Sequence, residues 1–192
     1  MTGGHEFWLI SRSAGVVALV LCAASVLIGL TLAAGLAGPP KRRRALVTFH
    51  EQTALGTLIA IAVHGAALLG DGYLKPGVAD ITIPFVLDYR PVDVGLGIFG
   101  GYLAAFLGLS FYARRRIGAK RWRTLHRATP VVYALGLIHT LGAGTDAGSS
   151  WLRAFMLATA VPATALLVAR VRKQRLIRRR KASNISVTPT KI

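Results

Sequence analysis

The chain has 192 residues, 53% of them hydrophobic and only 16% charged, with a formal net charge of +17 at pH 7. This composition is more apolar than that of an ordinary soluble domain. The one cysteine, Cys22, excludes an intrachain disulfide and a cysteine-based metal cluster. Nucleic-acid binding needs basic residues on one face of a soluble domain, whereas here they are confined to segments between apolar runs. We therefore expect a membrane protein that contacts the lipid bilayer and no nucleic acid.

Five apolar segments each hold close to the ~20 residues that a membrane-spanning helix requires. They are residues 14–37, 45–69, 94–112, 125–143 and 151–169. The first is too long, and has too little positive charge before it, for a signal peptide. The sequence predicts an all-α membrane protein built as a five-helix transmembrane bundle. Residues 1–13 are then an external N-terminal segment, and residues 170–192 are a basic tail whose end, from residue 182, is disordered.

Charge alternates between the loops that join these segments. Basic residues gather in residues 41–44, 114–127 and 170–181. Acidic residues lie in the other loops, at Asp71, Asp80, Asp88, Asp93 and Asp146. The positive-inside rule places the basic segments in the cytoplasm, so the N-terminus is predicted outside and the C-terminus inside a bacterial-type plasma membrane. The second and fourth segments consequently run parallel.

Four of the five histidines lie in these two parallel segments, and His5 lies apart near the N-terminus. His64 follows His50 at position i+14, and His139 follows His126 at position i+13. At about 1.5 Å per residue each pair spans roughly 20 Å, close to the depth of a bilayer core. His50 therefore shares the inner level with His126, and His64 shares the outer level with His139. This layout suits two haems stacked across the membrane, because a haem that transfers electrons takes two axial imidazoles.

The i, i+13 spacing of His126 and His139 raises a geometric problem. On an ideal helix a step of i+14 returns to within about 40° of the same face, but a step of i+13 ends about 140° away. Pro130 lies between His126 and His139 and removes the backbone hydrogen bond to the His126 carbonyl. We expect the fourth helix to be distorted there.

Two alternatives stay open on the residues alone. One is a haem-free or metal-binding scaffold subunit, although zinc takes three or four protein ligands and each level offers two imidazoles, with Glu51 beside His50. The other is a quinol-coupled enzyme whose quinone site lies near Tyr73, Tyr89 or the outer histidines. These tyrosines belong to a long, partly apolar loop, residues 70–91, which we expect to lie on the membrane surface or to cover the outer site.

Haem propionates need cationic or hydrogen-bonding partners at the two surfaces. Arg123 and Arg127 flank His126 on the inner side. The outer candidates, besides Arg12, are Arg90, Lys75 and Arg153. A flat macrocycle must also approach the helices closely, and glycines near the histidines supply room, namely Gly56, Gly65, Gly136 and Gly142.

The stretch RWRTLHR at residues 121–127, followed by Tyr133 and His139, resembles the RW-x-x-LHR…Y…H signature of ferric reductase-like transmembrane domains. That superfamily includes the membrane halves of ferric reductases and NADPH oxidases, and the haem-binding subunit of the bacterial periplasmic methionine-sulfoxide reductase. His50 and His64 fall where the family's other ligand helix carries its histidines. The resemblance extends over residues 12–170.

The resemblance implies b-type haems held as His50–His126 and His64–His139, in a haem domain of residues 14–169. The family core commonly has six helices, against the five expected here, and full reductases add a flavin and nicotinamide domain. No G-x-G-x-x-G follows a predicted strand in this sequence. The expected function is therefore electron transfer across the membrane, as the membrane subunit of an oxidoreductase rather than a complete enzyme. The donor would be a separate cytoplasmic flavoprotein or quinol, with an acceptor on the outer side, and the residues do not specify whether a flavin or quinone also binds.

Overall fold

The computed structural model describes residues 3–186 and contains no strand in that range. Its helices are α1 (Gly3–Ala34), α2 (Pro40–Leu68), α3 (Val78–Thr82), α4 (Pro91–Leu109), α5 (Arg114–Ile117), α6 (Ala119–His126), α7 (Thr129–Ala143) and α8 (Ser150–Ser186). Four of the described helices, α1, α2, α4 and α8, are long and apolar enough to cross a membrane. The prediction of an all-α, multi-pass membrane protein is confirmed at this level.

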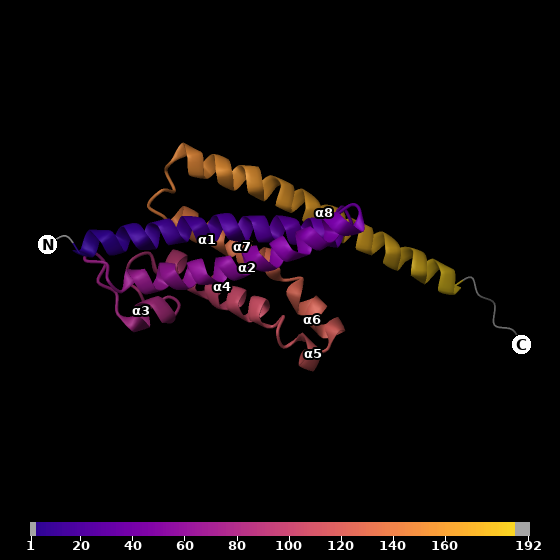
Figure 1. Ribbon diagram of the computed structural model, residues 1–192, viewed down its shortest axis with the longest axis horizontal. Helices are drawn as coiled ribbons and strands as arrows, with labels where there is room; N and C mark the ends of the chain where they lie inside the picture. Colours follow the sequence, from indigo (N-terminus) through magenta and orange to yellow (C-terminus); the bar gives the residue numbers. More distant parts are fainter. Residues whose placement is uncertain (1–2, 187–192) are drawn as a thin grey trace, which may run out of the picture.

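By their contacts, α1, α2, α4 and α7 form a ring, and α8 packs against α1. Figure 1 shows these helices running along the length of the bundle. Around the ring α1 contacts α2, α2 contacts α4, α4 contacts α7, and α7 contacts α1. On α8, Leu152 and Met156 pack against Leu19 of α1 in the main hydrophobic core. A hydrogen bond of 2.6 Å between the hydroxyls of Tyr133 and Thr159 joins α7 to α8. In this arrangement α2 and α7 lie across the ring from each other, with α1 and α4 on either side of both.

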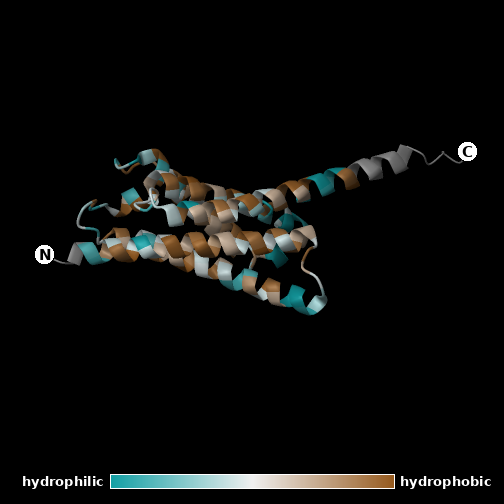
Figure 2. Cartoon of the chain, turned by 90° about the horizontal axis from the view of Figure 1, so that it is seen from above, coloured by the Kyte–Doolittle hydropathy of each residue, from teal (hydrophilic) through white to brown (hydrophobic). Residues whose placement is uncertain are grey.

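The two ends of the bundle differ in charge. One end, here called the acidic end, contains the start of α1, α3 and the loop between α7 and α8, with Asp71, Asp80 and Asp146 (Figure 1). The other, here called the basic end, contains the α1–α2 turn, α5 and α6, with the basic residues of 41–44 and 114–127. Hydrophobic residues predominate on the helices between the two ends (Figure 2). Both patterns are typical of a membrane protein.

The α1–α2 turn brings the first two helices together as antiparallel neighbours. Gly35 and Gly38 have φ angles of 78° and 75°, in the left-handed region that glycine adopts without steric cost. Pro40 then occupies the first turn of α2, where its missing N–H would have no helical partner. The short turn fixes how residues of α1 and α2 lie opposite each other, and this register positions the site described below.

The segment predicted as one helix over residues 125–143 is two helices, α6 and α7, separated by Arg127 and Ala128. Pro130 lies in the first turn of α7 and cannot donate to the His126 carbonyl, so a single regular helix is interrupted. The Thr129 hydroxyl donates to that carbonyl instead, over 3.0 Å. The break removes the angular problem of the i, i+13 spacing, because the two histidines no longer share one helix. With 15 residues, α7 is only about 22 Å long.

Both α1 and α8 are longer than the sequence predicted. α1 begins at Gly3, so the described part of residues 1–13 continues the first helix instead of forming a separate segment. α8 runs to Ser186, so the basic residues after 169 continue the last helix, in keeping with the good helix propensity of lysine and arginine. Residues 182–186, for which the sequence predicted disorder, are thus helical, and 187–192 lie outside the described residues.

Candidate functional site

Two pairs of histidine rings face each other inside the bundle. His50 of α2 and His126 at the end of α6 have ring centroids 5.9 Å apart, with their planes at 84°. His64 of α2 and His139 of α7 have centroids 6.1 Å apart, with their planes at 75°. The structure therefore brings together the same pairs that the sequence placed at two levels. The first pair lies toward the basic end and the second toward the acidic end.

Helix α1 holds His64 through Ser11. The Nδ1–H of His64 donates to the Ser11 carbonyl over 2.8 Å and lies 3.1 Å from the Ser11 hydroxyl oxygen. The Ser11 hydroxyl donates in turn to the His64 carbonyl over 3.0 Å. Because a carbonyl oxygen can only accept, Nδ1 must carry the proton of the neutral ring, and Nε2 is left with a free lone pair.

The same helix holds His50 through Ser25. The Nδ1 atom of His50 lies 2.9 Å from the Ser25 carbonyl oxygen and 3.1 Å from its hydroxyl oxygen. This bond again requires the proton on Nδ1 and leaves Nε2 free. Both histidines of α2 are therefore oriented by main-chain acceptors of α1, the helix to which α2 is joined by the short glycine turn.

Helix α4 holds His139. The Nδ1–H of His139 donates to the Asp93 carbonyl over 2.9 Å. Gly97, one turn further along α4, lies against the same ring, and a Cβ added there would overlap the imidazole. Gly97 belongs to a G-x-G-x-x-G run, residues 95–100, that lies within a helix and not after a strand. In this chain Gly97 serves the close approach of α4 and α7.

His126 is positioned by different contacts. Its Nδ1 atom is buried and has no hydrogen-bond partner within the described residues. It lies near the Leu107 carbonyl, which accepts a hydrogen bond of 2.7 Å from the Ser110 hydroxyl. The indole of Trp122 stacks on the His126 ring, with centroids 4.9 Å apart and planes at 24°. Stacking on the preceding turn of α6 therefore orients this ring.

The geometry of both pairs fits one metal ion between two imidazoles. With metal–nitrogen bonds of about 2 Å, two rings on opposite sides of one ion have centroids about 6 Å apart. The observed values are 5.9 and 6.1 Å. A neutral imidazole whose Nδ1–H binds a carbonyl is the usual form of a metal ligand. Across residues 3–186 no group of three or more histidine, cysteine, aspartate or glutamate side chains is placed to hold a metal ion. Each level therefore holds a pair of facing imidazoles.

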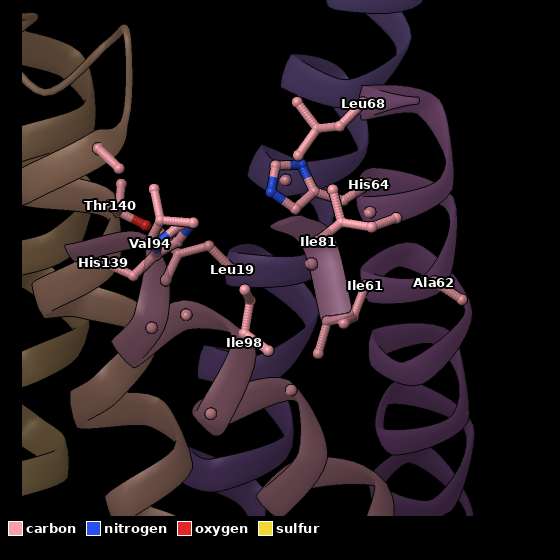
Figure 3. A pocket seen from close by; sticks show the side chains of 18 of the residues that line it. Leu19, Ile61, Ala62, His64, Leu68, Ile81, Val94, Ile98, His139 and Thr140 are labelled. Atoms are coloured by element: carbon pink, nitrogen blue, oxygen red, sulfur yellow. The ribbon is translucent and has the colours of Figure 1, made fainter. Parts of the chain in front are cut away.

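A cavity of about 950 Å³ adjoins the His64–His139 pair. This volume lies in the range of roughly 300–1,000 Å³ that is typical of ligand and cofactor sites. His64 and His139 lie on facing walls, and Leu19, Ile98 and Ile81 are among the apolar residues that line the cavity (Figure 3). Ile81 belongs to α3, so the loop of residues 70–91 borders the His64–His139 site, as expected.

The four glycines that the sequence analysis selected behave differently. Gly65 and Gly136 line the cavity, where they leave room for a bound group. A Cβ at Gly56 would instead meet Leu21, and a Cβ at Gly142 would overlap Asp93. The last two glycines thus serve helix packing.

The predicted cationic partners lie at both ends of the bundle. Arg123 and Arg127 are exposed at the basic end. Arg170 of α8, which was predicted only as part of the basic tail, lies close enough to Arg127 for their like charges to interact. Neither Arg127 nor Arg170 has a carboxylate partner among the described residues, which favours binding of an anionic group at the basic end.

At the acidic end, the Arg90 guanidinium donates to the Gly142 carbonyl.

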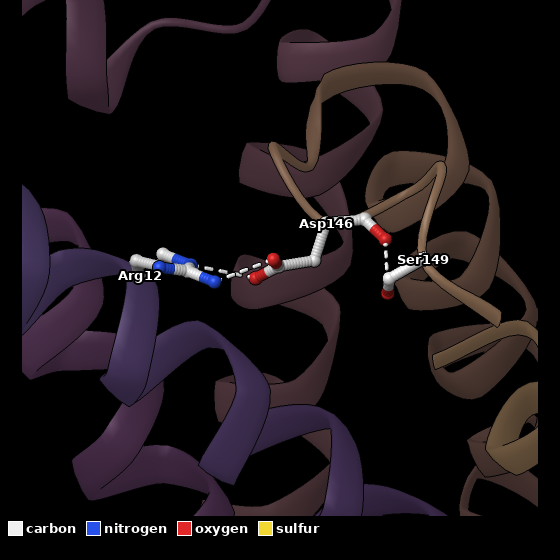
Figure 4. Close-up of polar contacts among 3 residues, drawn as sticks. All are labelled: Arg12, Asp146 and Ser149. Atoms are coloured by element: carbon white, nitrogen blue, oxygen red, sulfur yellow. Dashed lines mark hydrogen bonds and ion pairs between the residues drawn. The ribbon is translucent and has the colours of Figure 1, made fainter. Parts of the chain in front are cut away.

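An ion pair joins the α7–α8 loop to α1. The Nε and Nη2 atoms of Arg12 donate to the two carboxylate oxygens of Asp146 over 2.7 and 2.5 Å, and Ser149 donates to the Asp146 carbonyl (Figure 4). The hydrogen bond from Arg12 holds the pKa of Asp146 below its ordinary value, against a smaller opposing effect of desolvation. Both charged residues also line the cavity. The bidentate pair therefore fastens the α7–α8 loop beside the His64–His139 cavity.

Four residues that orient the histidines were not predicted from the sequence, namely Ser11, Ser25, Asp93 and Gly97. One signal for two of them was present. Ser25 follows Ser11 at i+14, the same spacing with which His64 follows His50. Because α1 and α2 are antiparallel and both spacings are 14 residues, a register that places Ser11 beside His64 also places Ser25 beside His50.

The fold and the paired histidines define a multi-pass membrane protein with two internal histidine sites, one toward each end of its helical bundle. The model of the family described as "Ferric reductase like transmembrane component" matches residues 14–137, which is more than half of the chain. The chain belongs to this family, whose members are membrane components of electron transfer and generally bind haem. The matched region contains His50, His64 and His126, and His139 lies just beyond it. No curated protein and no solved structure matches the chain significantly.

Proposed function

We propose that the chain is a transmembrane b-type cytochrome that holds two haems and passes electrons across the membrane. One haem would lie between His50 and His126, and the other between His64 and His139. The observation that carries this proposal is the pairing of imidazoles at two levels with ring separations of 5.9 and 6.1 Å. Three of the four rings donate Nδ1–H to a carbonyl and so present a free Nε2.

Haem would supply a one-electron iron couple, and two axial imidazoles leave no open position on the iron for oxygen chemistry. The hydrogen bonds at Nδ1 would orient the ligand rings, and the apolar helices would keep water from the sites. Arg123 and Arg127 would bind propionates at the basic end, and Arg90 would do so at the acidic end. Arg90 can serve this role only by exchanging its present acceptor, the Gly142 carbonyl.

The same proposal includes five membrane crossings. α6 and α7 together would make the fourth, because α7 alone has only 15 residues and a bilayer core is about 30 Å thick. The distribution of basic residues supports an outer N-terminus and a cytoplasmic C-terminus in a bacterial-type plasma membrane. The His50–His126 site is then the inner site, and the His64–His139 site is the outer one.

Electrons would enter from a separate flavoprotein or from quinol and leave to an acceptor on the outer side. The exposed arginines of the basic end suit an acidic partner protein or the phosphate of a flavin. A quinol-coupled enzyme is the second candidate, in which quinol would reduce the outer haem at its cavity and the electrons would not cross from the inner site. Tyr73, Tyr89 and Asp71 line this cavity, and one carboxylate oxygen of buried Asp71 has no partner among the described residues, so it could accept a proton that quinol releases on oxidation.

An optical spectrum of the purified chain, oxidised and then reduced with dithionite, tests the proposal. We expect the bands of low-spin b haem, and a pyridine-haemochrome assay should give two haems per chain. The haem should be removed by acid acetone, because the sequence has no C-x-x-C-H attachment motif. A colourless, folded protein would instead support the alternative, a haem-free or metal-binding scaffold. Reduction by quinol but not by a reduced flavoprotein would identify the donor class.

A further inference from the structure

Helix α1 repeats one short unit at the spacing of the histidines. Ser11 and Gly15 form a Ser-x-x-x-Gly unit, and Ser25 and Gly29 repeat it at i+14. Over such a step a helix returns to within about 40° of the same face. Both serines therefore face α2, where His50 and His64 have the same i, i+14 spacing.

Each unit contacts one histidine in the same way. The serine provides a carbonyl and a hydroxyl oxygen to Nδ1, at 2.8 and 3.1 Å for Ser11 with His64 and at 2.9 and 3.1 Å for Ser25 with His50. Both serines are almost fully buried, with 2% and 7% of their surface exposed. Buried hydroxyls with the same partner atom in both units are not explained by helix packing alone.

The glycine of each unit sets how closely α1 approaches the ring. A Cβ at Gly15 would come within 3.0 Å of Nδ1 of His64, and a Cβ at Gly29 within 3.1 Å of Cε1 of His50. These distances are shorter than ordinary van der Waals contacts, so an alanine would displace the ring by a few tenths of an ångström. The glycine thus lets the ring reach the serine acceptors.

We propose that α1 is a ligand-positioning helix whose two Ser-x-x-x-Gly units separately fix the tautomer and ring orientation of the two α2 histidines, and thereby tune the reduction potential of the outer and the inner haem. This inference rests on the proposed haem binding. A hydrogen bond from Nδ1–H to an acceptor makes the imidazole a stronger donor to the iron, which favours the ferric state and lowers the potential. Ser11 and Gly15 act on the outer level, and Ser25 and Gly29 act on the inner level.

The test compares Ser11→Ala, Gly15→Ala, Ser25→Ala and Gly29→Ala in the purified full chain, with the exposed Ser13→Ala on the same helix as control. Redox titration followed optically gives both potentials, and low-temperature EPR reports the orientation of the axial rings. The His64→Ala and His50→Ala variants, each left with one level, identify which signal belongs to which haem.

We expect Gly15→Ala, which moves the His64 ring away from the Ser11 carbonyl, to raise the potential of the outer haem and to leave the inner one unchanged. Ser11→Ala keeps that carbonyl and removes only the hydroxyl contact to Nδ1, so it should raise the outer potential by less. Gly29→Ala and Ser25→Ala should have the corresponding effects on the inner haem, and Ser13→Ala should change neither potential. The glycine variants should also hold their haem about 10- to 100-fold more weakly. The proposal would be overturned if a variant shifted the reduction potential of the other haem, or shifted both potentials equally. Unchanged potentials with both haems retained, or loss of both haems, would also overturn it.

Failure of the proposed function gives a different result. If the unsubstituted chain carries no haem, haem binding itself is wrong. The positioning role can then still be measured, because ¹⁵N chemical shifts of His64 and His50 report the tautomer directly. Loss of the Nδ1–H form in Gly15→Ala for His64 only, and in Gly29→Ala for His50 only, would support it. Unchanged shifts in both variants would contradict it.

Discussion

Gly97 of α4 and His139 of α7 are in such close contact that a Cβ on Gly97 would overlap the imidazole ring. The ring also donates its Nδ1–H to the Asp93 carbonyl of the same helix over 2.9 Å. We therefore expect Gly97→Ala to expel His139 from its place, to remove the outer haem and to destabilise the fold by about 1–3 kcal/mol through overpacking. Haem per chain should fall from two to one.

The control for this prediction is Gly108→Ala on the same helix. A Cβ there would meet only the flexible end of Leu58, at 3.2 Å. This variant should keep both haems. Equal loss of haem from Gly97→Ala and Gly108→Ala would show that any added methyl on α4 is harmful, and the specific role of the Gly97–His139 contact would be refuted.

Trp122 orients His126 by stacking, since the Nδ1 atom of His126 has no hydrogen-bond partner within the described residues. Stacked aromatic pairs contribute about 0.5–1.5 kcal/mol beyond area burial. Trp122→Ala should therefore weaken retention of the inner haem by roughly two- to tenfold, whereas Trp122→Phe should keep most of it. Titration of haem into the stripped protein measures both.

A matched control is Trp151→Ala, because that indole is 52% exposed at the start of α8. It should leave both haem affinities unchanged. If Trp122→Ala weakens the outer haem and spares the inner one, the assignment of His126 to the inner site is wrong.

The ion pair between Arg12 and Asp146 predicts a pH dependence. Its hydrogen bonds lower the pKa of Asp146 in the folded protein, so the pair contributes stability at neutral pH. That contribution is lost as the pH falls from the unfolded pKa through the lowered folded value. Asp146→Asn should remove this pH-dependent contribution. Between pH 5 and pH 3 the Tm of the variant should therefore fall less than that of the unsubstituted chain, as measured by differential scanning calorimetry. Parallel curves for the two proteins would show that the pair does not contribute.

The purified chain should not oxidise NADPH or NADH. Nicotinamide domains of the dinucleotide-binding type are built on a parallel sheet, and residues 3–186 contain no strand. Dithionite or a suitable donor should nevertheless reduce both haems. Stopped-flow spectra after mixing with NADPH alone should remain those of the ferric protein. Rapid reduction by NADPH, without an added flavin or protein, would contradict the role of an electron-transfer component that depends on a separate donor.

The positions of the histidines were predictable because charge and hydropathy fix them. The basic segments show which helix ends lie on the same side, so α2 and the α6–α7 segment must run parallel. Histidines at similar distances from those ends then lie at the same level, which pairs His50 with His126 and His64 with His139. Side-chain contacts between helices were not needed for this inference. It depends only on the direction and length of the helices.

The contacts that hold the rings depend on details that hydropathy does not contain. The acceptors for Nδ1 are mostly main-chain carbonyls, at Ser11, Ser25 and Asp93, and every residue type carries a carbonyl. The break between α6 and α7 was expected only as a distortion at Pro130, because the competing hydrogen bond from Thr129 is a local packing outcome. The lengths of α1 and α8 were underestimated because their polar ends lie outside the apolar pattern.

The most direct test of the account is the haem content of single histidine variants. His64→Ala and His139→Ala should lose the same haem, with the same residual spectrum and potential, and His50→Ala and His126→Ala should lose the other. His5→Ala should keep two haems, because His5 is exposed and contacts only Trp8 in the ring stacking that the structure shows. Pyridine-haemochrome analysis and redox titration of the five variants measure this. The account predicts one haem in each of the four site variants, and matching residual spectra for His50→Ala with His139→Ala would contradict it.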